Sequence, residues 1–172
     1  MIKPLSRQSL SLSFALCLVF CSALFAIAQN EESMPTPEEA GQLLNAGKFA
    51  EAEKAWAAIA GANPQVGPAW FNLGFARHMQ KNYDGAVEAW TKAGELEFMQ
   101  ATVHFNIACA LALSGKKDSA LDHLEKAVEA GFSSDEEIGL LEADADIASL
   151  RDDPRFPGIL AKAKGEDSSE DQ

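Results

Sequence analysis

The sequence contains few cysteines and few basic residues. Its 172 residues include three cysteines, and its 14 lysines and arginines face 26 aspartates and glutamates, which gives a formal net charge of -12. A field of this sign repels phosphate backbones and anionic membrane surfaces. With 47% hydrophobic residues, a chain of this length can bury one modest core. We therefore expect one domain with tails and no nucleic-acid partner.

The N-terminal segment 1–28 has the features of a secretory signal peptide. Lys3 and Arg7 precede an apolar run, and the sequence AIA, which ends at Ala28, is a small-x-small cleavage pattern. We expect cleavage after Ala28 and a periplasmic or secreted protein with a formal net charge of -14, because Lys3 and Arg7 are lost. The alternative is an uncleaved membrane anchor through residues 14–28. A lipoprotein signal is disfavoured, because a large residue precedes each early cysteine.

Cleavage would remove Cys17 and Cys21 and leave Cys109 as the remaining cysteine. A single thiol cannot form an intramolecular disulfide, so the fold would be stabilised by packing alone. Cys109 lies in an apolar segment with no neighbour in the sequence that would lower its pKa. We interpret it as an inert core residue rather than a reactive thiol.

The sequence repeats itself every 34 residues. In this register Ala52 aligns with Ala86 and Ala120, and the segments WFNLG and HFNIA, which begin at residues 70 and 104, align with each other. Self-similarity at a fixed period is typical of stacked helical repeats. The spacing of apolar residues predicts two helices in each unit, with first helices at 68–80 and 101–114 and second helices near 50–61, 84–96 and 118–130.

Capping residues mark both ends of the repeats. Thr36 and Glu39 predict a capping box before the first unit, and Ser134 and Glu137 predict another after the third. Asp153-Pro154 predicts the start of a last helix.

Small residues inside the repeats predict turns and close contacts. We expect Asn82 and Gly115 to close the first helices in the left-handed conformation. We expect Gly74 to lie against Ala86, so that the paired helices approach closely.

These features resemble the tetratricopeptide repeat family, in its exported bacterial type. Trp70-x-x-Leu73-Gly74 followed by Ala86-x-x-x-Trp90 matches the spacing of that family. The sequence departs from it at three positions, since the family prefers Tyr and Pro where this chain has Arg77, Phe98 and Phe132. The segment DIASLRDDPRF at 146–156 is similar to one that often closes bacterial members.

The resemblance implies an all-α fold, a right-handed solenoid of about three helix-turn-helix units with C-terminal capping helices. The expected organisation is a linker at 29–36, an array at 37–134 with units at about 33–66, 67–100 and 101–134, capping helices at 135–164 and an acidic disordered tail at 165–172.

The sequence contains no pattern that predicts catalysis. The stretch SGKK at 114–117 would need a glycine at Ala110 and a Ser or Thr at Lys117 to form a phosphate loop. The three histidines, His78, His104 and His123, lack the spacing of metal ligands. We therefore expect no catalytic residue, no metal, no cofactor and no small-molecule substrate, so the protein is interpreted as not being an enzyme.

The first helices predict a partner-binding groove, because this family places them on the concave face. The helices at 68–80 and 101–114 carry a single formal charge, at Arg77, and their asparagines could bond a partner's backbone while apolar neighbours bury its side chains. The alternative is that these helices are apolar because they are packed on several sides, or that the chain's own ends cover them. The candidate groove residues are Phe71, Asn72, Phe75, His78, Met79, Phe105, Asn106, Cys109 and Leu113.

Together these observations favour a non-catalytic adaptor or scaffold that binds a protein or an extended peptide through its concave face. The alternative is a self-associating structural subunit of an envelope complex, which would be a homo-oligomer. A clamp for the C-terminal carboxylate of chaperones is disfavoured, because Pro37, Gly41 and Thr102 stand where such clamps need basic or amide side chains.

Overall fold

The structure is a computed structural model that describes residues 34–166. The predicted signal peptide, residues 29–33 of the predicted linker and residues 167–172 of the predicted acidic tail lie outside the described residues. The chain divides into two units after Met34, and every described helix belongs to the unit that begins at Pro35. Within residues 34–166 no helix is long and apolar enough to cross a membrane.

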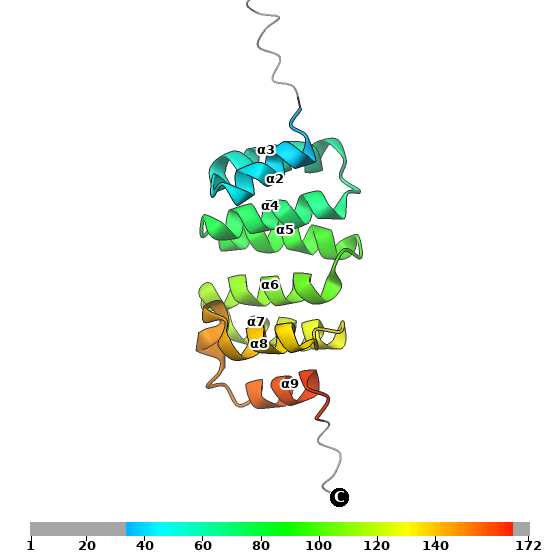
Figure 1. Cartoon of the computed structure of the whole chain (residues 1–172). Helices are drawn as coiled ribbons and strands as arrows, with labels where there is room; N and C mark the ends of the chain where they lie inside the picture. Colours follow the sequence, from blue (N-terminus) through cyan, green and yellow to red (C-terminus); the bar gives the residue numbers. More distant parts are fainter. Residues whose placement is uncertain (1–33, 167–172) are drawn as a thin grey trace, which may run out of the picture. The chain divides into compact units, whose positions relative to one another are not determined.

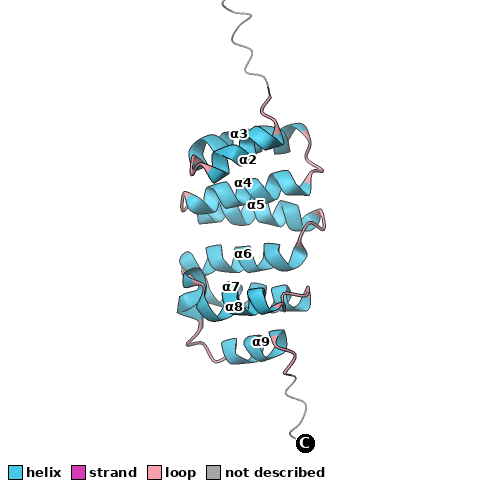
Figure 2. Ribbon diagram, in the orientation of Figure 1, coloured by secondary structure: helices cyan, strands magenta, loops and turns pink. Residues whose placement is uncertain are grey.

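The described elements are all helical and follow one another in three pairs, with further helices at the C-terminal side (Figures 1 and 2). Each helix packs on the next in the chain from α2 to α7, which confirms the predicted all-α solenoid. The predicted helix ranges agree with the observed ones to within one residue at each end. The elements are α2 (Pro37–Asn45), α3 (Phe49–Ala62), α4 (Gly67–Met79), α5 (Tyr83–Glu95), α6 (Gln100–Leu113), α7 (Lys117–Glu129), α8 (Asp135–Ala143), the 3-10 helix η1 (Ala145–Leu150) and α9 (Phe156–Ala163).

The turn inside each helix pair uses the same repeat position. Gly47, Lys81 and Gly115 are 34 residues apart and have φ angles of 71°, 63° and 76°, in the left-handed region that closes a helix. The prediction for Gly115 is thus confirmed, but the prediction for Asn82 is wrong. Asn82 has a φ of -83° and caps the start of α5, where its side-chain oxygen accepts a hydrogen bond from the Gly85 N–H at 3.2 Å.

Both predicted capping boxes are present. The Thr36 hydroxyl accepts from the Glu39 N–H at 3.2 Å while the Glu39 carboxylate accepts from the Thr36 N–H at 2.9 Å, and Ser134 and Glu137 repeat the arrangement before α8. The last helix starts later than expected, at Phe156 rather than at Asp153-Pro154. Asp153 instead accepts from the Arg155 N–H at 2.9 Å and holds a turn before the helix.

Close packing inside the second pair depends on Gly74, although not through the expected partner. A Cβ added at Gly74 would lie 2.5 Å from the indole ring of Trp90, so the nearest side chain is that of Trp90 and not that of Ala86. The indole N–H donates to the Phe71 carbonyl at 3.0 Å, which fixes the ring against α4. The missing side chain of Gly74 therefore makes room for the largest buried side chain of α5.

Candidate functional site: the concave face of the first helices

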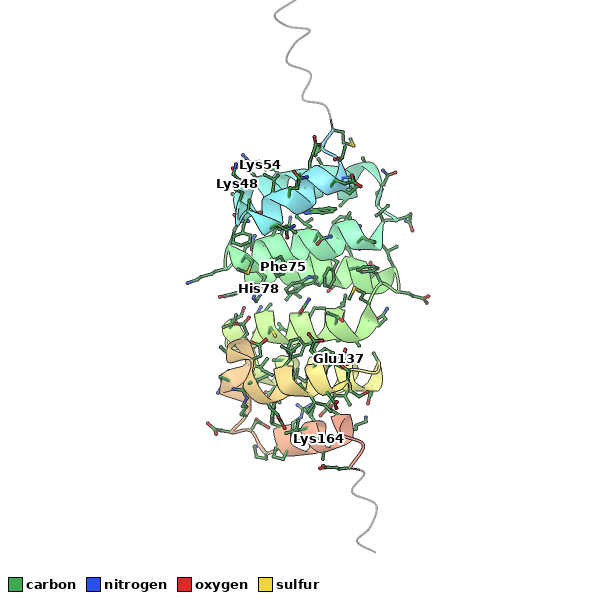
Figure 3. All side chains as sticks on the ribbon, in the orientation of Figure 1. Lys48, Lys54, Phe75, His78, Glu137 and Lys164 are labelled. Carbon is green, nitrogen blue, oxygen red and sulfur yellow. The ribbon has the colours of Figure 1, made fainter. Side chains whose placement is uncertain are left out.

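The second unit presents exposed apolar side chains on α4. Phe75 and Met79 are four residues apart, so they lie on one face of the helix, and 39% and 44% of their surfaces are exposed. Phe71 and Asn72 are half-buried. Figure 3 shows Phe75 near His78 at the level of α4 and α5. Large apolar side chains that stay this exposed are candidates for contact with a partner.

Two of the predicted groove residues in α4 already make contacts with other residues of the chain. The ring of Phe71 packs edge-on against Phe98, with ring centroids 5.6 Å apart. The Asn72 amide donates to the Pro68 carbonyl of its own helix at 2.9 Å. One amide hydrogen and the amide oxygen of Asn72 remain for other partners, since this bond uses a single N–H.

The third unit differs at the equivalent positions. Phe105 and Cys109 are each only 4% exposed, and the Phe105 ring stacks on Phe132 with centroids 4.6 Å apart. Asn106 is half-buried, and Leu113, at the end of α6, is 40% exposed. Two of the four predicted groove residues in this unit are therefore buried.

The chain's own C-terminal part packs against this unit. Residues 144–150, which we call the cover segment, comprise Asp144 and η1 and pack on α6. Ile147 and Leu150 of the cover segment are completely buried. At the third unit, the chain itself therefore covers part of the surface that the sequence predicted as a groove.

The cover segment also reaches back to the second unit. His78 Nε2 lies 2.9 Å from Asp146 Oδ2, so the imidazole donates a hydrogen bond to the carboxylate across the two units. His78 Nδ1 is buried and has no hydrogen-bond partner among the described residues. His78 is therefore a link to the cover segment as well as a predicted groove residue.

The Cys109 thiol faces two carboxylates of the cover segment. The sulfur lies within 4.8 Å of carboxylate oxygens of Asp144 and Asp146. Burial, and then the negative charges of Asp144 and Asp146, raise the pKa of the Cys109 thiol well above its usual range. The thiol is therefore a poor nucleophile, in agreement with its interpretation as an inert residue.

These three side chains are the largest set of potential metal ligands within residues 34–166, but both carboxylates already accept hydrogen bonds. The Asp144 side chain accepts from the Asp146 N–H at 2.9 Å, and Asp146 accepts from His78. The hydrogen bond from His78 attaches the cover segment to α4, while the segment packs on α6.

A second contact was missed by the sequence analysis. His104 on α6 and His123 on α7 are 19 positions apart, a spacing with no ligand pattern, yet their Nδ1 atoms lie 3.2 Å apart. Because α6 and α7 pair within one repeat unit, the fold brings together two histidines that a linear search treats as unrelated.

Comparisons with known proteins agree with the repeat architecture. Residues 39–95 match a family model described as tetratricopeptide repeat. No curated protein matches the chain. SycD, a type III secretion translocator chaperone of Yersinia enterocolitica, is 21% identical, with a TM-score of 0.53, 80% of this chain covered and 90% of that chain.

Two further solved structures have the same fold at similar distance. PcrH, solved in complex with the chaperone-binding region of PopD, is 16% identical, with 96% of this chain and 98% of that chain covered and a TM-score of 0.52. A chain of a type III secretion complex from Aeromonas hydrophila is 18% identical, with 84% and 97% covered and a TM-score of 0.51. At these identities the likeness concerns the fold. The 34-residue repeat, the three helix pairs and the family match together identify the chain as a tetratricopeptide repeat protein.

Proposed function

We propose that the protein is a non-catalytic adaptor that binds an extended peptide, or an extended segment of a protein, in the open part of its concave face. The observation that carries this proposal is the exposure of Phe75 and Met79 on α4. The helix α2 contacts α4, and a Cβ added at Gly41 of α2 would meet nothing within 4 Å. Gly41 and Phe75 are 34 residues apart and so occupy the same position of two adjacent units. We call the surface formed by Gly41, Asn72, Phe75 and Met79 the open groove.

The open groove has the chemistry that an extended peptide needs. Phe75 supplies a rigid apolar surface, and Met79 adapts its shape to different side chains because it is unbranched and flexible. Asn72 offers an amide oxygen and one N–H, which match the donor and acceptor of a peptide backbone. We therefore expect a ligand with apolar side chains on one face, held by its backbone at Asn72.

Proteins of similar fold support peptide binding. SycD has been solved with a peptide of the translocator YopD, and PcrH with the chaperone-binding region of PopD. One fold hosts many functions, so this support concerns what a stack of such helices can hold and not which partner this chain selects.

We further propose that the protein is exported, and that its partner is found in the periplasm or outside the cell. The basis is the charged, apolar and AIA sequence of residues 1–28. The intact mass of the protein recovered from its host should correspond to a chain that begins at Gln29. Recovery of an uncleaved form from membranes would support the anchor instead.

Site-specific photocrosslinking in the native host tests the adaptor proposal. A photoreactive phenylalanine analogue at Phe75 should trap a partner, whereas the same group at Glu88, exposed on α5, should not. The double variant Phe75→Ser with Met79→Ser should lose most of its partner, because two buried apolar side chains contribute about 1.5–3 kcal/mol each.

Three other results of these experiments would contradict the adaptor proposal. Equal crosslinking from Phe75 and Glu88 would contradict binding at the open groove. A crosslinked product that is a dimer of this chain would favour the self-associating structural subunit. Retention of the partner by the folded double variant would show that the partner binds elsewhere.

A further inference from the structure

The pair of His104 and His123 has the geometry of two ligands of one metal ion. Their Nδ1 atoms are 3.2 Å apart, and the rings are tilted by 59° with centroids 5.2 Å apart. Two imidazole nitrogens bound at 2.0–2.1 Å to a tetrahedral ion are separated by about 3.3 Å. The two side chains thus already stand at the spacing that such an ion requires.

Both rings are in the state that binds metal. Burial, then the charge of Lys126, lowers the pKa of His104, and burial, then His104 and Lys126, lowers the pKa of His123 to about 4. Both imidazoles are therefore neutral at neutral pH, and a neutral imidazole is the ligand form of histidine. Lys126 opposes a bound cation, and Asp122, which also faces His123, offsets part of that charge.

A cavity beside the pair offers oxygen ligands and space. It has a volume of about 260 Å³ and is lined by both histidines and Glu95, with the apolar side chains of Val103 and Ile107 forming much of the rest. Glu95 is held by an ion pair with Lys92 at 2.8 Å, and its side chain is 56% exposed. Exposed pairs of this kind contribute little free energy, so the Glu95 carboxylate can turn toward the histidines at small cost.

We propose that His104 and His123, completed by Glu95 and water, bind a divalent first-row transition-metal ion. Imidazole and carboxylate ligands together suit Zn²⁺, and two imidazoles also suit Cu²⁺ and Ni²⁺. The bound ion joins α6 and α7 of the third unit to α5 of the second unit. The site lies outside the open groove and does not depend on the proposed adaptor function.

The competing set is Cys109 with Asp144 and Asp146, which the same metal would also suit. Its carboxylates already accept hydrogen bonds from His78 and from a backbone N–H. The histidine pair has no such second contact, since the recorded hydrogen bond of each ring is to the other ring. An ion bound at the histidines would therefore displace fewer existing hydrogen bonds than an ion bound at Cys109, Asp144 and Asp146.

Titration of the untagged full chain with Zn²⁺ tests the proposal. The protein carries Cys17→Ser and Cys21→Ser, so that those thiols cannot bind, and is first stripped of metal with a chelator. Calorimetry should show one saturable site per chain. His104→Ala and His123→Ala should each weaken binding at least tenfold, Glu95→Gln should weaken it less, and Cys109→Ser should leave it unchanged.

A second measurement distinguishes loss of metal binding from loss of the fold. Zn²⁺ should raise the Tm of the stripped protein, and the rise should disappear in His104→Gln and His123→Gln variants that keep the native circular dichroism spectrum. Absence of binding in the stripped protein would overturn the proposal. It would equally be overturned if Cys109→Ser removed the binding and the histidine variants kept it, because the ion would then bind at the cover segment.

Discussion

The second and third repeat units place equivalent residues in different environments. Phe75 and Cys109 are 34 residues apart, and one is 39% exposed while the other is 4% exposed. Phe71 is half-buried, whereas its counterpart Phe105 is buried and stacked on Phe132. The repeat position fixes the side of the helix on which a residue lies. It does not fix what covers that side.

The difference comes from the segment that follows each unit. The second unit is followed by another helix pair, and its first helix α4 contacts the short helix α2, where a Cβ added at Gly41 would meet nothing within 4 Å. The third unit is followed by the cover segment, which buries Ile147 and Leu150 against it. The same side of the first helix is thus exposed at Phe75 of the second unit and covered by the chain itself at Cys109 of the third.

The largest expected effect on stability comes from a substitution that loosens the packing of the cover segment. Ile147→Ala should lower the free energy of unfolding by about 2–5 kcal/mol, because it leaves a cavity under a completely buried residue. The Cys109 thiol should then react faster with a thiol reagent, since the segment that buries it opens more often. Denaturant unfolding and labelling kinetics, in protein with Cys17 and Cys21 replaced by serine, measure the two effects.

Ser149→Ala is the matched control in the same segment. Ser149 is exposed, so its replacement should change stability by no more than about 0.5 kcal/mol and leave the labelling rate as it was. If Ile147→Ala lowers stability without faster labelling, the cover segment does not protect Cys109, and the comparison between the two units would need another cause.

The next effect concerns how the helices of each pair pack. Gly74→Ala should destabilise the protein by about 1–3 kcal/mol, because its Cβ would lie 2.5 Å from the Trp90 ring. The third unit has Ala108 and Leu124 at these two positions, so a Cβ is accommodated where the partner is smaller. The double variant Gly74→Ala with Trp90→Leu reproduces the residues of the third unit at these positions. It should therefore lower the free energy of unfolding by less than the sum of the two single variants.

Gly41→Ala serves as the opposite case. Gly41 lies inside α2, and an added Cβ meets nothing within 4 Å, so alanine should stabilise the protein by up to about 1 kcal/mol through helix propensity. Thermal or denaturant unfolding of the two glycine variants should give shifts of opposite sign. Shifts of the same sign would show that the contact with Trp90 is not what requires glycine at position 74.

The sequence predicted the fold well because its signals are local and repeated. Three copies of a 34-residue pattern predicted the helix pairs. The capping boxes at Thr36 and Ser134 predicted where α2 and α8 begin. The role of Trp90 as the side chain nearest to Gly74 was not predicted, because spacing shows where a small residue is needed but not which side chain fills the space. Asn82 was misassigned for a similar reason, since asparagine suits both a left-handed position and an N-cap.

The site could be predicted only in part. The register placed Phe75 and Met79 on the concave side, and the structure finds both exposed. The burial of Cys109 could not be predicted, because Cys109 faces Asp144 and Asp146, which are about 35 positions away and outside the repeat pattern. The contact of His104 with His123 likewise arises from helix pairing and has no signature in linear spacing.

A smaller effect should distinguish the two groove asparagines. Asn72→Ala should weaken binding of the captured partner by about 0.5–1.5 kcal/mol, the value of a typical hydrogen bond. Asn106→Ala should have less effect, because Phe105, which stacks on Phe132, and Cys109, which faces the cover segment, are both buried beside it. Binding isotherms with the crosslinked partner, or a peptide from it, measure both. Equal losses would mean that the partner also reaches the third unit and displaces the cover.

The smallest expected effect tests the cap that positions α8 ahead of the cover segment. The Glu137 carboxylate accepts hydrogen bonds from the Ser134 N–H and the Ser133 N–H, each at 2.9 Å. Burial favours the protonated acid, but the bonds from Ser134 and Ser133 outweigh it and hold the pKa of Glu137 below its usual value. A carboxyl group whose pKa is lower in the folded state than in the unfolded state stabilises the fold above the unfolded pKa, and this contribution is lost as the pH falls through the folded value.

Glu137→Gln should therefore lower stability by at most about 1 kcal/mol at pH 7, as expected for the loss of a helix cap. The difference from the wild type should shrink as the pH falls below the ordinary glutamate pKa of about 4.3, because the wild-type side chain then also becomes neutral.

Glu136→Gln removes the same charge from the same first turn of α8. Its cost at pH 7 should be smaller than that of Glu137→Gln, because the capping-box hydrogen bonds remain. Unfolding midpoints of the three proteins at pH 7 and near pH 3 measure this directly. Equal costs for both variants at pH 7 would show that charge at the helix start, and not the capping box, holds α8 in place before the cover segment.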